Sequence, residues 1–211
     1  MKKIVIIANG EVPDGRFLKN LVKSANYVIA ADGGLDICLA NNIIPDCLIG
    51  DLDSFNSFPI SISKSTNILR IPDQNTTDIQ KALAHAATLN PQTIEICASF
   101  GKRTDHSLGN IIILNSYASD TKLIMHDNYG TFTSLKPGTT RFKNKKGQTV
   151  SLFSLVDVSN IHLSGFEFPL DRNNLVPPFL GVSNKICEDE AEIKFDKGKL
   201  LIYELNKDRN T

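Results

Sequence analysis

The 211-residue chain has no excess of charge of either sign. Lysine and arginine together number 23, and aspartate and glutamate together also number 23, so the formal net charge is zero. A balanced chain exerts no general electrostatic attraction on nucleic acid or on an anionic membrane. We therefore expect neither as a partner, and any anionic ligand must be bound by a local site.

Cysteine is scarce and scattered. The four cysteines form no Cys-x-x-Cys pair and no cysteine–histidine cluster with zinc spacing. Three of them stand within apolar runs, which is typical of reduced core residues in a cytoplasmic protein. No run is long enough to span a membrane, and the run Ile4–Ala8 is too short for the core of a signal peptide. We expect a soluble protein in the cytoplasm.

The first part of the chain alternates apolar runs with helical patterns. Continuous apolar runs are typical of strands that are buried on both faces of a parallel sheet. Between two of them, Ile79, Ala82, Leu83 and Ala86 recur with helical spacing. The expected strands are Lys3–Ala8, Tyr27–Ala31, Cys47–Ile49, Asn67–Ile71, Thr93–Ala98 and Lys122–His126. This alternation predicts an α/β domain with a doubly wound, mostly parallel sheet.

Two further helix signals support this fold class. Thr77 and Gln80 stand three residues apart at the start of the first helical pattern, as in a capping box. A second helical segment follows Asp105, with Leu108, Ile111 and Ile112 on one face.

The pattern changes near Asp127. Beyond it we expect short strands at Gln148–Leu155 and Glu192–Phe195, and a hairpin turn at Asp196–Lys199 before a strand at Leu200–Leu205. Pro and Gly punctuate this segment, and no helical pattern is convincing. We predict an α/β catalytic domain over residues 1–127 and a smaller antiparallel β-sandwich or barrel over residues 128–211.

Acidic residues follow the predicted strands of the first domain. In a doubly wound sheet the loops after the strands meet at one edge, where such folds bind ligands. Six carboxylates would meet there, from Asp32, Asp51, Asp53, Asp73, Asp78 and Asp105. Acids in such number repel one another unless a cation lies among them, and oxygen ligands suit Mg²⁺. Gly50 is expected to permit the turn that presents Asp51 and Asp53.

The same edge carries groups that suit phosphate. Ser99–His106 leads from a strand into a helix and supplies a glycine, two cations and a helix N-terminus. Acids for a metal beside cations for phosphate indicate a site for Mg²⁺ and a nucleotide. A single Asp beside a strand is more often a turn former or helix cap than a ligand. We accept that interpretation for Asp46, which precedes the third predicted strand, and it stays open for Asp78 and Asp105.

Four blocks of the first domain resemble the thiamine pyrophosphokinase family. They are ADGG at Ala31–Gly34, IIPDCLIGDLDS at Ile43–Ser54, DQNTTD at Asp73–Asp78 and GKRTDHSLGNI at Gly101–Ile111. Two weaker blocks in the second domain are SGFEFPL at Ser164–Leu170 and VSNKI at Val182–Ile186. The resemblance implies transfer of pyrophosphate from ATP to the hydroxyl of thiamine with release of AMP. It also implies a homodimer with sites between the subunits, and a second domain that binds thiamine.

The resemblance also implies roles for individual residues. Asp51, Asp53 and Asp78 would hold Mg²⁺. Arg103 would hold the phosphate chain, and Asp78 and Asp105 are candidates for the base that accepts the hydroxyl proton. Substrate contacts are expected from Asp32, Asp73, Gln74, Thr77, Lys102, Asn110, Phe168, Ser183 and Asn184. Phe168 would stack on thiamine, and Ser183 and Asn184 would border its ring.

The chain departs from the family at two positions. Asn75 stands where the family commonly has a further acid, and Phe168 where it has Trp or Tyr, so Phe168 keeps the ring face without a polar edge. Two other functions stay open. A related pyrophosphokinase could act on a hydroxymethylpterin, and a nucleotide-binding sensor could have lost catalysis.

Overall fold

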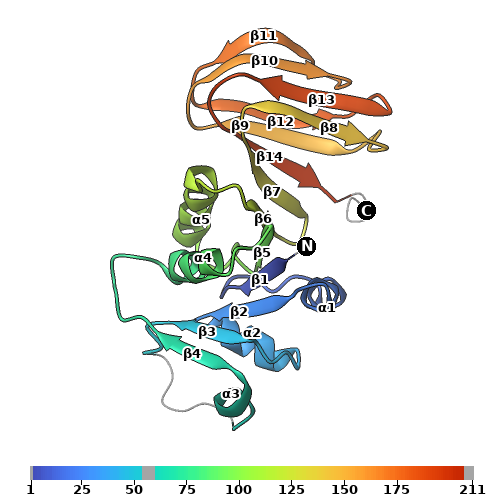
Figure 1. Ribbon diagram of the computed structural model, residues 1–211. Helices are drawn as coiled ribbons and strands as arrows, with labels where there is room; N and C mark the ends of the chain where they lie inside the picture. The colour runs from blue at the N-terminus through green and yellow to red at the C-terminus, as the bar shows by residue number, and fades with distance from the viewer. Residues whose placement is uncertain (1, 54–59, 207–211) are drawn as a thin grey trace. The chain divides into compact units, whose positions relative to one another are not determined.

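The computed structural model describes residues 2–53 and 60–206 (Figure 1). Ser54, the last residue of the second sequence block, lies outside the described residues. The chain divides into two compact units, residues 1–128 and 129–211. In the described part of the chain, no helix is both long and apolar enough to cross a membrane.

The first unit is built on six parallel strands in the order β6-β5-β1-β2-β3-β4 (Figure 1). The strands are β1 (Lys3–Ile7), β2 (Tyr27–Ala31), β3 (Cys47–Gly50), β4 (Asn67–Arg70), β5 (Thr93–Cys97) and β6 (Lys122–His126). The helices are α1 (Gly15–Lys23), α2 (Gly34–Ala40), α3 (Ile60–Ser65), α4 (Asp78–Thr88) and α5 (Thr104–Ser116). All six strands predicted from apolar runs are present.

Helices cover both faces of this sheet. Val5 and Ile7 of β1 share one buried cluster with apolar residues of α1 and α2. Successive residues of a strand point to opposite faces, so Ile4 and Ile6, also fully buried, face the other side. Helix α4 packs on β1, β2 and β3 and contributes nothing to the first cluster. The prediction of a doubly wound, mostly parallel sheet is confirmed.

The sheet reverses its strand order between β1 and β5. From β1 the chain adds β2, β3 and β4 on one side, and then β5 and β6 on the other. Loops that leave β1 and β5 therefore separate at their carboxyl ends, and a crevice opens at this point of a doubly wound sheet. The segments after β1 and β5 both contribute to the cavity described below.

The second unit contains two antiparallel sheets, with strand orders β12-β9-β14-β7 and β11-β10-β13-β8 (Figure 1). The strands are β7 (Gly130–Leu135), β8 (Gly138–Lys143), β9 (Thr149–Ser154), β10 (Val158–Ser164), β11 (Leu170–Leu175), β12 (Phe179–Lys185), β13 (Glu190–Phe195) and β14 (Leu200–Leu205). Both sheets supply side chains to one core, among them Leu152, Leu163 and Phe195. The predicted smaller antiparallel β fold is confirmed, in its sandwich form.

The predicted hairpin at Asp196–Lys199 is wrong. The two strands that it joins, β13 and β14, belong to different sheets. Lys197 pairs instead with Ser159 next to the start of β10, and a Cβ on Gly198 would lie 2.1 Å from the carbonyl oxygen of Asp157. The turn therefore packs against the start of β10 and carries the chain from one sheet to the other.

Candidate functional site

A cavity of about 660 Å³ lies in the first unit, at the carboxyl ends of its strands. Four of the six acids predicted at this edge line it: Asp32, Asp51, Asp78 and Asp105. The other two, Asp53 and Asp73, are described but are not part of the lining. The further polar residues of the lining include Asn9, Gln74, Thr77, Lys81, Ser99, Lys102, Arg103, His106 and Asn110.

The ADGG block brings the ends of β1 and β2 close together. A Cβ on Gly34 would lie 2.0 Å from the carbonyl oxygen of Ile7, and one on Gly33 would lie 2.1 Å from Nδ2 of Asn9. The contact at Gly34 is with backbone, so only glycine permits this approach, whereas at Gly33 the side chain of Asn9 would have to move. The backbone of Asp32 itself has a φ of 42°, in the left-handed region. Its conformation turns the chain from β2 into α2 at the cavity.

The carboxylate of Asp32 is half-buried among other acids. Burial raises its pKa, and the charges of Asp78, Asp51 and Asp53 raise it further. The backbone N–H of Gly33 lowers the pKa, but the net shift is upward. Within the described residues, Oδ1 of Asp32 is buried and has no hydrogen-bond partner. A buried carboxylate oxygen without a partner is costly, so this atom is a candidate contact for a ligand or a cation.

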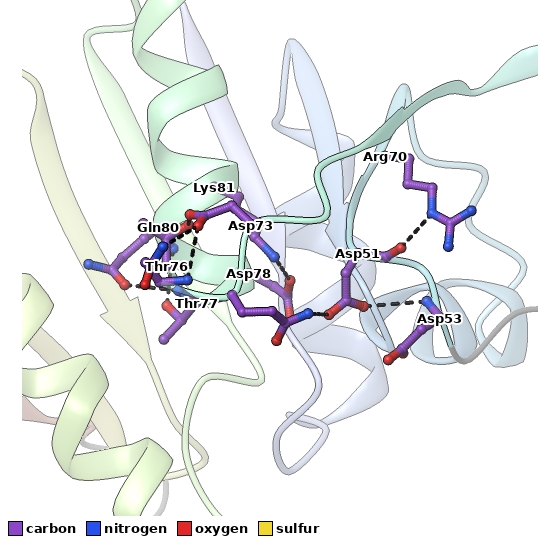
Figure 2. A network of polar contacts seen from close by, with 11 residues as sticks. Asp51, Asp53, Arg70, Asp73, Thr76, Thr77, Asp78, Gln80 and Lys81 are labelled. Carbon is purple, nitrogen blue, oxygen red and sulfur yellow. Dashed lines mark hydrogen bonds and ion pairs between the residues drawn. The ribbon is translucent and has the colours of Figure 1, made fainter.

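Asp51 and Asp53 follow β3, as predicted. The two oxygens of Asp51 accept hydrogen bonds from the backbone N–H of Asp53, at 3.3 Å, and from Nε2 of Gln74, at 3.1 Å. These two contacts are the main causes that lower the pKa of Asp51. Arg70 donates from Nε to the carbonyl oxygen of Asp51 at 2.9 Å. Figure 2 shows Asp51 between Arg70 and the loop that precedes α4.

Gly50 does not supply the turn expected of it. The residue with a left-handed backbone is Leu52, whose φ is 57° and whose side chain is buried. Gly50 serves a different purpose, because a Cβ there would lie 2.9 Å from Cβ of Asp32. The missing side chain lets the ends of β2 and β3 approach, which brings Asp32 and Asp51 to the same cavity.

Asp73 stabilises its own loop. Its Oδ1 accepts hydrogen bonds from the backbone N–H and the side-chain amide of Asn75, and its Oδ2 accepts one from the hydroxyl of Thr76 at 2.6 Å. The bond from Thr76 is the largest cause that lowers the pKa of Asp73, followed by the backbone N–H of Asn75. Asn75, the departure from the family pattern, is therefore a donor within this loop.

Helix α4 begins at the cavity with the predicted capping box. The hydroxyl of Thr77 accepts a hydrogen bond from the backbone N–H of Gln80, and the side chain of Gln80 accepts one from the backbone N–H of Thr77. This cap fixes the first turn, which carries Asp78. Oδ1 of Asp78 accepts a hydrogen bond from Nζ of Lys81 at 3.2 Å (Figure 2).

The loop from β5 to α5 carries two cations to the cavity. Arg103 donates to both oxygens of Asp105, from Nε at 3.1 Å and from the terminal nitrogen at 2.5 Å. This pair lowers the pKa of Asp105 to about 2. Lys102 donates to Oδ1 of Asn9 at 3.1 Å, and the amide of Asn110 donates to the carbonyl oxygen of Ser99 at 2.6 Å. Lys102 and Asn110 thus hold the ends of β1 and β5 around the cavity.

The predicted thiamine contacts lie in the second unit. Phe168 is 65% exposed. Asn184 is buried, accepts a hydrogen bond from the backbone N–H of Phe168 at 3.1 Å and donates one to its carbonyl oxygen at 2.8 Å. Ser183 has a φ of 60° and donates from its backbone N–H to the hydroxyl of Ser151. Asn184 therefore holds the Phe168 segment, a role that the sequence analysis did not foresee.

Five polar residues of the cavity lining were assigned no individual role from the sequence: Asn9, Thr76, Lys81, Ser99 and His106. Asn9 and Ser99 lie directly after apolar strands, so the rule that located the acids applies to them as well. Lys81 carried a different signal, because it interrupts the buried face of α4 between Ile79 and Ala82. A charge on that face indicates a nearby partner.

Two family models cover most of the chain. The model of the thiamin pyrophosphokinase catalytic domain matches residues 18–125, and the model of the thiamin pyrophosphokinase vitamin B1 binding domain matches residues 139–200. The chain belongs to the thiamine pyrophosphokinase family. The two matched regions fall in the first and the second unit, respectively.

Individual thiamine pyrophosphokinases match over nearly their whole length. That of Bacillus subtilis (strain 168) is 29% identical over 214 residues, which cover 96% of this chain and 98% of that protein. A crystal structure of thiamine pyrophosphokinase from Bacillus subtilis has a TM-score of 0.82 and 25% identity, and covers 98% of this chain and 100% of that chain. The structure of thiamin pyrophosphokinase from Candida albicans shares the fold. Its TM-score is 0.81 at 17% identity, and the match covers 97% of this chain and 88% of that chain.

Membership of the thiamine pyrophosphokinase family decides between the functions left open above. The family transfers pyrophosphate from ATP to thiamine, and this chain is an ATP-dependent pyrophosphotransferase. Neither a hydroxymethylpterin pyrophosphokinase nor a non-catalytic sensor is favoured by these relatives.

Proposed function

We propose that the cavity of the first unit binds ATP together with Mg²⁺ and is where pyrophosphate leaves the nucleotide. The distribution of charge around the cavity carries this proposal. Asp32, Asp51 and Asp78 come from one side of the strand-order reversal, and Lys102 and Arg103 come from the other. Carboxylates suit the cation and basic groups at a helix N-terminus suit phosphates.

Asp51, Asp53 and Asp78 would hold the Mg²⁺. Within the described residues, no three histidine, cysteine or acidic side chains converge into a complete metal site. Mg²⁺ takes oxygen ligands, and substrate phosphates and water would supply those that the carboxylates do not. The partnerless Oδ1 of Asp32 supports the same proposal, because a cation or its water would satisfy that oxygen. Bound Mg²⁺ would neutralise charge on the phosphate oxygens.

The chain's own residues would orient the phosphates. Arg103 presents a planar guanidinium at the cavity, and Lys102 adds a second positive charge beside it. Gln74 and Thr77 approach from the segment before α4, where the capping box holds Thr77 and a hydrogen bond to Asp51 holds Gln74. Asn110 holds the carbonyl oxygen of Ser99 and so steadies the loop that carries the cations. Alignment and charge stabilisation are the main catalytic contributions expected in phosphoryl transfer.

The thiamine hydroxyl would attack the β-phosphorus of ATP, and AMP would leave. The pair with Arg103 lowers the pKa of Asp105 to about 2, which makes Asp105 a poor base. Asp78 accepts a hydrogen bond from Lys81 and is also a proposed metal ligand. We therefore assign Asp105 the role of orienting Arg103, and we keep Asp78 as the candidate base.

The second unit would bind the thiamine ring. The exposed ring of Phe168 supports a stacking role, and Asn184 would act by holding the Phe168 backbone. We also propose a homodimer in the cytoplasm. The exposed apolar side chains of Val176, Leu180 and Val182 support association, and the buried, unpaired thiols suit a reducing compartment. Light scattering on the purified protein tests the dimer.

Phosphorus NMR of the purified protein with ATP, Mg²⁺ and thiamine tests the function. AMP and thiamine diphosphate appearing together are expected. ADP in place of AMP would show transfer of a single phosphoryl group and would contradict the proposed attack on the β-phosphorus. Omitting Mg²⁺ in the presence of a chelator should stop the reaction, and turnover that continues would contradict the metal assignment.

A further inference from the structure

Lys81 is a lysine buried on the acidic side of the cavity. It lies on α4 between Ile79 and Ala82, and only 5% of its surface is exposed. Lysine is almost never buried unless a partner or a ligand compensates its charge. Packing of the helix against the sheet does not require a charge at this position, since the neighbouring buried residues of α4 are apolar.

The ammonium of Lys81 contacts one carboxylate. Its Nζ lies 3.2 Å from Oδ1 of Asp78, one turn earlier on the same helix. In the described part of the chain this is the one hydrogen bond that the ammonium donates, although it carries three N–H donors. Lys81 also lines the cavity, so its other donors are available to a ligand there.

Lys81 and a divalent cation would compete for the same carboxylate. A cation bound by Asp78 would lie beside the ammonium, because both would contact one carboxyl group, and the two positive charges would repel each other. Oxygens of a polyphosphate placed between them would attract both. The ammonium therefore opposes a cation that arrives alone and favours a cation that is bound with phosphates.

We propose that Lys81 couples the two ligands of the cavity: it weakens binding of the divalent cation to the free enzyme and strengthens binding of the cation together with the nucleotide. The inference rests on the proposed function of the cavity and goes beyond it, because it concerns the dependence of one ligand on the other. Such coupling is reciprocal, so the cation must raise the affinity for the nucleotide by the same factor.

Titration with Mn²⁺, followed by electron paramagnetic resonance, tests the coupling in the wild-type protein and in Lys81→Met. Each protein is titrated with and without α,β-methylene-ATP, in which a carbon replaces the bridging oxygen of the bond that the reaction breaks. In Lys81→Met, Mn²⁺ should bind the free protein more tightly than in the wild type. The factor by which the nucleotide analogue raises Mn²⁺ affinity should fall about tenfold or more.

Two further variants separate coupling from structure. Lys81→Arg keeps the charge and should keep most of the coupling. Lys19→Met removes an exposed charge from α1, outside the cavity lining. It should leave the Mn²⁺ affinity unchanged both with and without the nucleotide analogue. If Lys81→Met does not fold, Lys81→Gln takes its place in the same titrations.

The outcomes distinguish the inference from the function on which it rests. The role of Lys81 would be overturned if, without the nucleotide analogue, the Lys81 variant bound Mn²⁺ no more tightly than the wild type does. The role of Lys81 would also be overturned if the variant lost Mn²⁺ affinity equally with and without the nucleotide analogue and melted at a lower temperature. That result would indicate a lysine that only stabilises the fold. If the wild-type protein itself binds no Mn²⁺ with the analogue, the proposed function of the cavity fails instead.

Discussion

The two units of this protein offer different surfaces for chemistry. In the first unit, the parallel strands β1, β2 and β3 are buried almost throughout, so polar groups are confined to the loops at their ends. In the second unit, the antiparallel strand β12 has exposed residues along its length, and Ser183 and Asn184 lie on the strand itself. In the first unit, the residues that stabilise the fold lie in the strands, and those proposed to bind ligands lie in the loops after them. In the second unit, the two kinds of residue alternate along the same strands.

The largest expected effect tests that separation in the first unit. Asp51→Asn keeps the shape of the side chain but removes a charge proposed to hold Mg²⁺, and kcat should fall by at least about 100-fold. The thermal unfolding midpoint should change little, because the side chain lies in a loop and the amide oxygen of asparagine can still accept the hydrogen bond from the backbone N–H of Asp53. Phosphorus NMR and calorimetry measure the two quantities.

Asp46→Asn is the matched control for this change. Oδ2 of Asp46 accepts the backbone N–H of Val28 at 2.8 Å, before β3 and away from the cavity lining. Asp46 therefore has a structural role, but it links to β2 and forms neither the turn nor the cap that was expected. Its substitution should leave kcat within about twofold, since it touches none of the groups that stabilise the transition state. Retained turnover in Asp51→Asn would contradict the metal assignment.

Two phenylalanines test the alternation in the second unit. Phe195 is 1% exposed in the core between the two sheets, and Phe195→Ala should lower the free energy of unfolding by about 3–5 kcal/mol. Phe168 is exposed, so Phe168→Ala should change that free energy by less than about 0.5 kcal/mol.

Phe168→Ala should instead raise the KM for thiamine about fivefold while leaving the KM for ATP unchanged, because a stacked ring contributes on the order of 1 kcal/mol. Urea unfolding and steady-state kinetics measure the two effects. An unchanged KM for thiamine would remove the stacking role of Phe168.

Gly34 breaks the simple separation, because it lies at the edge that carries function and yet determines packing. A methyl group there would lie 2.0 Å from the carbonyl oxygen of Ile7. Gly34→Ala should therefore lower the free energy of unfolding by about 3 kcal/mol. Gly109→Ala is the control. A Cβ at this position within α5 meets no atom within 4 Å, and alanine is the better helix former, so stability should rise by up to about 1 kcal/mol.

The smallest expected effect concerns a polar exception among the strands of the first unit. Glu95 of β5 contacts Nε2 of His126 and Nζ of Lys3, each at 2.7 Å. Burial raises the pKa of Glu95, but its hydrogen bonds from His126 and Lys3 outweigh this and lower the pKa below 4.5. The carboxylate therefore stabilises the fold above the pKa of the unfolded chain, and this contribution is lost as the pH falls through the lower, folded value.

Glu95→Gln tests this sign. At pH 7 it should lower the free energy of unfolding by about 1.5 kcal/mol, because it weakens hydrogen bonds to a charged group. The difference from the wild type should shrink as the pH falls below 4.5, the ordinary value for glutamate. Urea unfolding at pH 7 and pH 4 measures it, and a difference that grows at the lower pH would contradict the assignment.

Local patterns predicted the first unit better than the second. The capping box of Thr77 and Gln80 was readable because all its partners lie within four residues. The turn at Asp196–Lys199 was misread because its partner, Ser159, lies far away in sequence. Strands such as β10 and β11 went unpredicted, since a half-exposed antiparallel strand needs no continuous apolar run.

The amino-acid sequence by itself determined the family, the strands of the parallel sheet and the edge at which the acids gather. Those properties depend on apolar runs and short motifs, which act over a few residues. Only the tertiary structure decided which acids reach the cavity. Asp32 has an oxygen without a hydrogen-bond partner there, whereas both oxygens of Asp73 accept hydrogen bonds from its own loop. It also decided that Lys81 is buried beside Asp78 at the cavity, because the burial of a side chain depends on how separate elements pack.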